Sequence, residues 1–134
     1  MANPFVHIEL NTDDAAGAKK FYQKLFDWEW SATKMPGGTY HMIKTSPKGA
    51  GGGVQKKPMP EAPTAWLPYV EVDDVKRALA KARKFGAQVV LDYVEIGGMG
   101  SIGIFVDPTG AALGVWAPAP RKQPAKAKRR APKR

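Results

Sequence analysis

The amino-acid sequence predicts an α+β fold in which two βαβββ repeats form a curved mixed sheet around a central cleft. Two observations lead to this prediction. A strand pattern followed by a helix pattern occurs twice, 60 residues apart, and three further strand patterns follow each time. One such unit covers only one face of its sheet with its helix, so the bare faces of two units must close on each other and enclose a space. We expect the repeats at about 4–55 and 64–118.

The first repeat begins with a strand and a helix within residues 5–28. Apolar Val6, Ile8 and Leu10 alternate with polar residues, which is typical of a strand with two different faces. Capping residues follow, and a helical stripe is then formed by Ala15, Ala18, Phe21, Tyr22 and Leu25. We expect this stripe to pack on the apolar face of the strand, so that His7 and Glu9 point together into the cleft.

The remaining elements follow from turn signals and alternation. We expect strands at 28–33 and 39–45, and in the glycine-rich segment 46–54 a weak strand or a close backbone approach. A linker with three prolines spans 56–63. The second repeat then gives a strand at 65–72, a helix from 75 to 85 after two aspartates, and strands at 89–96, 101–106 and 111–116.

Length and charge suggest one domain with a basic extension. The chain has 134 residues and a net charge of +9, but residues 1–120 hold 13 cations against 12 acids. We therefore expect a single domain at 1–120 and a flexible tail at 121–134. The tail would either bind nucleic acid or another polyanion without sequence preference, or act as a solubilising extension. Its cations are Arg121, Lys122, Lys126, Lys128, Arg129, Arg130, Lys133 and Arg134.

Other sequence features indicate the cellular compartment of the protein. The chain has no cysteine, which excludes disulfides, thiolate metal sites and a cysteine nucleophile. The start, MANPFVHIEL, lacks the pattern of a secretory signal, and no window approaches the length of a membrane span. We expect a cytoplasmic protein with no membrane association.

The motifs resemble those of a known superfamily. The chain has H-x-E-L-x-x-x-D and A-x-x-F-Y-x-x-L-F-x-W in the first half, V-x-V-D-D-V in the second and D-P-x-G near the end. Over about residues 4–118 it resembles the vicinal oxygen chelate superfamily, which includes glyoxalase I, bleomycin-resistance proteins and extradiol dioxygenases. The resemblance fits the glyoxalase-like and bleomycin-resistance-like members of unassigned activity.

The resemblance implies where a divalent metal would be held. Enzymes of this superfamily bind nickel, zinc, iron or manganese with residues on the first and last strands of each half. The first ligand falls on His7, but the second falls on Leu67 and the terminal carboxylate on Gly114. A catalytic metal normally needs about three protein ligands. We therefore expect a degenerate site without a metal cofactor, and a metal held at His7 is the alternative.

The cleft residues follow from strand alternation and from the resemblance together. We expect a ligand to contact His7, Glu9, His41, Leu67, Tyr69, Gly114 and Trp116. Of these, His7 and Glu9 would carry any acid–base chemistry. Glu9 could instead pair with a cation and catalyse nothing.

Three functions remain open. The first is a homodimer, as the resemblance implies, that binds a small organic molecule in the cleft without metal-dependent catalysis. The second is a glyoxalase-like lyase or isomerase, or a dioxygenase, that uses a metal or His7 and Glu9. The third is an accessory protein that attaches to a polyanion through the tail.

Overall fold

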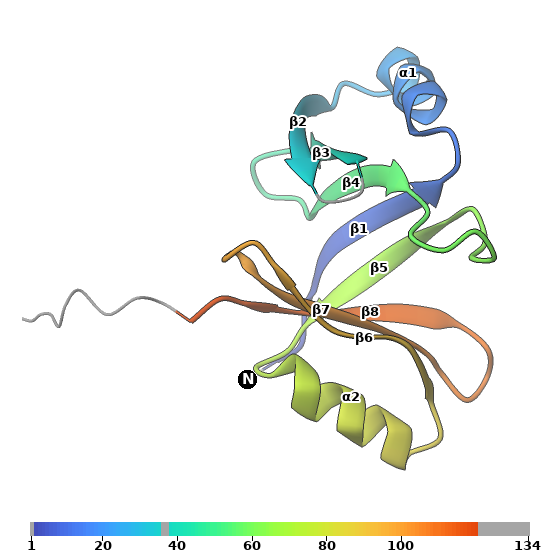
Figure 1. Ribbon diagram of the computed structural model, residues 1–134. Helices are drawn as coiled ribbons and strands as arrows, with labels where there is room; N and C mark the ends of the chain where they lie inside the picture. Colours follow the sequence, from blue (N-terminus) through green and yellow to red (C-terminus); the bar gives the residue numbers. More distant parts are fainter. Residues whose placement is uncertain (1, 36–37, 121–134) are drawn as a thin grey trace, which may run out of the picture.

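A computed structural model describes residues 2–35 and 38–120, and it contains one eight-stranded sheet and two helices (Figure 1). The first half comprises β1 (Phe5–Thr12), α1 (Ala15–Leu25), β2 (Glu29–Met35), β3 (Gly38–Lys44) and β4 (Gly51–Lys56). The second half comprises β5 (Ala65–Glu71), α2 (Val75–Lys84), β6 (Gln88–Ile96), β7 (Gly100–Val106) and β8 (Ala112–Pro118). The predicted α+β fold with two βαβββ units is confirmed. The predicted tail, 121–134, lies outside the described residues.

The two halves join through their first strands. The strand order is β2-β3-β4-β1-β5-β8-β7-β6, and β1 pairs with β5 in antiparallel register. This register places His7 opposite Tyr69 and Glu9 opposite Leu67. Within each half the first strand is parallel to the last, β1 with β4 and β5 with β8. The side chains of β1 and β5 therefore lie at the centre of the curved sheet.

The two helices are capped alike but are buried differently. Asp14 accepts a hydrogen bond from the backbone N–H of Gly17 at 2.9 Å, and Asp74 accepts one from Arg77 at 3.1 Å. In α2, Val75 and Leu79 are fully buried in one core cluster. No residue of α1 is buried, although it packs beside the second core cluster of Leu10, Ile43 and Val54. Figure 1 places the helices at opposite ends of the molecule.

The expected packing of the first helix is partly wrong. Of the three apolar residues on the first strand, only Leu10 belongs to the core cluster next to α1. The pairing of β1 with β5 shifts register between Phe5 and His7, and Val6 at this bulge lines the cleft instead. Ile8, whose register partners are Gly52 and Pro68, is 41% exposed. Helix residues Phe21 and Leu25 are also exposed.

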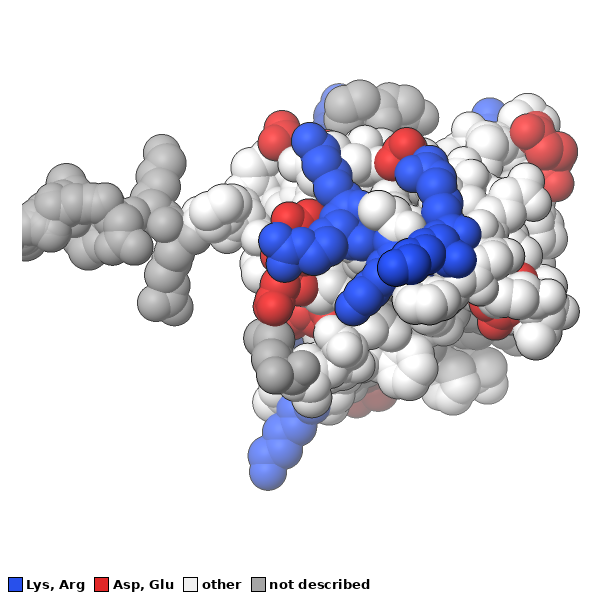
Figure 2. All heavy atoms as spheres, turned by 90° about the horizontal axis from the view of Figure 1, so that it is seen from below, with Lys and Arg blue, Asp and Glu red and all other residues white. Residues whose placement is uncertain are grey.

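Positive charge gathers on one helix. Figure 2 shows Lys and Arg side chains clustered on the face that carries α2. The residues of this patch are Lys76, Arg77, Lys81, Arg83 and Lys84. Neither helix of the described chain has the length and apolar character needed to cross a membrane.

Candidate functional site

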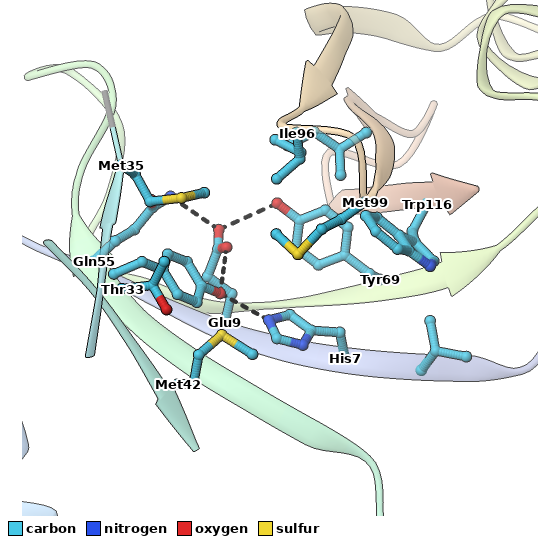
Figure 3. Close-up of a pocket in the computed structure, with 13 residues that line it drawn as sticks. His7, Glu9, Thr33, Met35, Met42, Gln55, Tyr69, Ile96, Met99 and Trp116 are labelled. Atoms are coloured by element: carbon cyan, nitrogen blue, oxygen red, sulfur yellow. Dashed lines mark hydrogen bonds between the residues drawn. The ribbon is translucent and has the colours of Figure 1, made fainter. Parts of the chain in front are cut away.

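A cavity of about 410 Å³ lies between the two halves, and all eight strands contribute to its wall (Figure 3). Most of the lining is apolar, with three methionines among it. The polar lining side chains that hydrogen-bond with one another come from β1, β3, β4 and β5. The lining residues are Val6, His7, Glu9, Thr33, Met35, Tyr40, Met42, Gln55, Tyr69, Ile96, Met99, Ile102 and Trp116.

Glu9 organises the polar side of this cavity. Its side chain is almost fully buried, with 5% exposed. Oε1 accepts a hydrogen bond from the hydroxyl of Tyr40 at 2.9 Å. Oε2 accepts from the hydroxyl of Tyr69 at 3.1 Å, from Asn11 Nδ2 at 3.1 Å and from Gln55 Nε2 at 3.2 Å. Four donors from four strands therefore point at one carboxylate.

The surroundings set the protonation of these groups. Burial raises the pKa of Glu9, and the four hydrogen bonds that it accepts lower it in part. Burial and the negative charge of Glu9 raise the pKa of both Tyr40 and Tyr69 well above that of a free phenol. Burial lowers the pKa of His7, so its imidazole is neutral at pH 7. Both tyrosines thus keep their protons and donate them.

A hydrogen-bonded chain connects His7 with Glu9. His7 Nε2 lies 2.7 Å from the hydroxyl oxygen of Tyr40, which in turn donates to Glu9. With the Tyr40 hydrogen used in this way, His7 must carry its proton on Nε2 and donate it. The reverse direction requires a protonated Glu9. One proton can therefore reside at either end of a three-residue path.

Two glycines make room for the two tyrosines. The ring of Tyr40 lies over Gly53 of the neighbouring strand β4, and the ring of Tyr69 lies over Gly114 of β8. A Cβ atom at either glycine would overlap the ring. In each half, therefore, a glycine on the last strand leaves space for a tyrosine ring to lie flat and reach Glu9.

The structure brings together four of the seven expected site residues. His7, Glu9, Tyr69 and Trp116 all line the cavity. Leu67 is buried on the same face as Tyr69, and Gly114 lies beneath the Tyr69 ring, but neither is part of the wall. These two residues do not line the cavity themselves and only pack beside residues that do.

His41 lies away from the cavity, because β3 turns Tyr40 and Met42 toward it and His41 to the other face. There, burial and the positive charge of Lys19 lower the pKa of His41. Of the other members of the Glu9 network, strand alternation indicates Asn11, which lies two residues beyond Glu9, whereas Tyr40 was missed because no local pattern points to it.

The donor set does not fit the divalent metal that the resemblance implies. Leu67 offers no donor atom, and the Tyr69 ring covers Gly114, where a carboxylate would be expected. Across residues 2–35 and 38–120, no three histidines or acids come together as a metal-binding group.

Comparison with known families identifies the chain. A sequence model described as "Glyoxalase/Bleomycin resistance protein/Dioxygenase superfamily" matches residues 5–115. The chain belongs to this superfamily. Among superfamily relatives, it is 36% identical over 113 residues to "Putative glyoxylase CFP32" of Mycobacterium tuberculosis, covering 81% of this chain and 43% of the relative. It is 28% identical over 128 residues to "Anthracycline biosynthesis protein DnrV" of Streptomyces peucetius, covering 81% and 45%. The chain thus spans less than half the length of these curated relatives.

Solved structures share the superfamily fold. Hypothetical protein BH1468 from Bacillus halodurans superposes with a TM-score of 0.69 at 11% identity, covering 91% of this chain and 99% of that one. Methylmalonyl-CoA epimerase from Mycobacterium tuberculosis gives a TM-score of 0.65 at 14% identity, covering 87% and 88%. At these identities the similarity concerns the fold alone.

Proposed function

We propose that this member of the superfamily binds a small organic molecule in the cavity between its two halves, without a catalytic metal. The observation that carries the proposal is the buried, four-donor carboxylate Glu9 at the wall of a largely apolar cavity. A volume of about 410 Å³ lies within the range of small-molecule sites. Convergent polar groups in an apolar pocket are the usual means of orienting such a ligand.

The energetics of Glu9 support a functional role. Burial of a carboxylate without a cation costs stability, and an apolar side chain of similar volume would usually avoid that cost. Here the carboxylate is retained and five side chains are arranged around it or its partners: His7, Asn11, Tyr40, Gln55 and Tyr69. Ionisable groups with perturbed pKa values in a cavity are typical of functional sites.

A screen by thermal shift tests this proposal. Small oxyacids, aromatic compounds and glycopeptide antibiotics are suitable libraries, because a ligand of the folded form raises its melting temperature. Ile102→Trp should fill the cavity and abolish the shift. Val90→Trp adds the same side chain at an exposed site that does not line the cavity and should leave the shift intact. A shift that persists in Ile102→Trp, or no ligand at all, would contradict the proposal.

A second candidate is proton-transfer catalysis, of the kind a glyoxalase-like isomerase or lyase performs. The observation that favours it is the path from His7 through Tyr40 to Glu9, which can hold one proton at either end. His7 would exchange a proton with a bound substrate, and Glu9 would accept or supply it through Tyr40. Exchange of a ligand C–H for deuterium, followed by NMR, tests this chemistry. Exchange that is equally fast in wild type and Tyr40→Phe would exclude the path.

We also infer a homodimer, as the superfamily resemblance implies. The support comes from α1 and its C-cap: Phe21 and Leu25 are 56% exposed, and the C-cap residue Phe26 is 45% exposed. Exposed apolar residues grouped on one element are typical of association surfaces. Light scattering should give the dimer mass for wild type and the monomer mass for Phe21→Glu with Leu25→Glu. A wild-type monomer would contradict the inference.

A further inference from the structure

The carboxylate of Glu9, which accepts four hydrogen bonds, has no positive partner in the cavity. Glu9 is the only acid in the wall, and no lysine or arginine of the described chain lines it. The two ion pairs of the described residues join Lys57 to Asp13 and Arg83 to Asp92. His7 is the remaining ionisable base, and its lowered pKa keeps it neutral. The donors that face Glu9 from β1, β3, β4 and β5 are all uncharged.

Hydrogen bonds alone do not balance this charge. The pKa of Glu9 stays raised although four donors lower it, so burial destabilises the carboxylate more than these hydrogen bonds stabilise it. A cation at contact distance would interact strongly here, because attraction between opposite charges grows as the surroundings become less polar. Oε1 also has room, since it accepts one hydrogen bond where Oε2 accepts three.

The other lining residues indicate what kind of cation would fit the cavity. Trp116 and Tyr69 present aromatic rings, and Met35, Met42 and Met99 present thioethers from three different parts of the chain (Figure 3). Aromatic faces attract organic cations, and methionine packs well on flat polarisable rings. Such a wall suits a planar ring system better than a flexible or strongly hydrated molecule.

We propose that the ligand of this cavity is a planar aromatic cation with an N–H group that donates to Glu9 Oε1, while its ring lies against Trp116 and the methionines. This inference rests on the proposed function and narrows it to one chemical class. The cavity discriminates against carboxylates and phosphates, because they would meet an unpaired negative charge in apolar surroundings.

Three ligands with one ring system and different charges test the inference. At pH 7.5, 9-aminoacridine is a cation, acridine is neutral and acridine-9-carboxylate is an anion. Fluorescence titration should give at least about tenfold tighter binding of 9-aminoacridine than of acridine, and weaker binding of the carboxylate. Glu9→Gln should remove the preference for the cation. Glu95→Gln, which changes an exposed glutamate on β6, should keep it.

The outcomes separate the two proposals. Equal affinity for the three ligands, or tightest binding of the anion, overturns the cationic class while the cavity remains a binding site. Binding of none of them also overturns it, and the thermal-shift screen then decides on the binding function independently. If Glu9→Gln does not fold, the wild-type series still decides, since it needs no variant.

Discussion

Replacing Tyr40 with phenylalanine should destabilise the protein more than replacing Tyr69, although each change removes one hydroxyl that donates to Glu9. Tyr40 is the donor on Oε1, and it is also the partner of His7 Nε2 at 2.7 Å. Its loss leaves both groups without a protein partner. After loss of the Tyr69 hydroxyl, Oε2 still accepts hydrogen bonds from Asn11 and Gln55.

The expected magnitudes follow from these partners. A hydrogen bond to a charged group contributes about 1.5–3 kcal/mol, and the larger costs arise when a buried group is left without any partner. Tyr69→Phe should therefore cost about 1.5 kcal/mol of unfolding free energy, because its acceptor keeps two donors. Tyr40→Phe should cost about 3 kcal/mol, because an acceptor and a donor both lose their partner.

Urea unfolding at pH 7.5 measures both values. Tyr93→Phe is the matched control, since its hydroxyl donates to the exposed Glu95 at 3.2 Å, and it should leave the midpoint unchanged. Equal costs for Tyr40→Phe and Tyr69→Phe would refute the unequal sharing of donors between the two oxygens. A Tyr40→Phe midpoint equal to that of the control would refute the network as a source of stability.

Three further predictions address the acid, the glycines and the tail. Burial raises the pKa of Glu9 in the folded protein above its ordinary value of 4.5, so folding favours the protonated acid. Wild type should therefore lose stability relative to Glu9→Gln as the pH rises from about 4.5 through the folded pKa. Thermal unfolding that shows the opposite trend would contradict this. Gly53→Ala should cost about 1–3 kcal/mol in urea unfolding by displacing the Tyr40 ring, whereas Gly51→Ala on the same strand meets no side chain within 4 Å and should be close to neutral; equal midpoints would contradict the close packing. Deletion of residues 121–134 should abolish retention on DNA at low salt. Unchanged retention would contradict this and would indicate that the cations of α2 contact the polyanion instead.

The order of elements could be predicted from sequence because its signals are local. Alternation over residues 5–11 and the second strand–helix pair at 65–85 each lie within one continuous segment. The bulge at Val6 could not be predicted in this way, because it arises from pairing with β5, more than fifty residues later in the chain. Strict alternation assumes a regular strand and therefore placed Val6 on the wrong face.

The candidate site was predictable only where strand alternation determines it. His7 and Glu9 share a face of the first strand, and both line the cavity as expected. The role of Tyr40 depends on Gly53 on a neighbouring strand, and no pattern within either segment indicates that contact. His41 was expected in the cleft as a polar residue of the third strand, but the face of a strand is set by its register, which the sequence alone left open.

Metal titration of the purified protein tests most directly whether the cavity lacks a catalytic metal. After dialysis against chelator, nickel, zinc, iron(II) and manganese are added in turn, and binding is followed by calorimetry for wild type and His7→Ala. We expect no saturable site that distinguishes the two proteins. One equivalent of metal bound by wild type and lost in His7→Ala would contradict it.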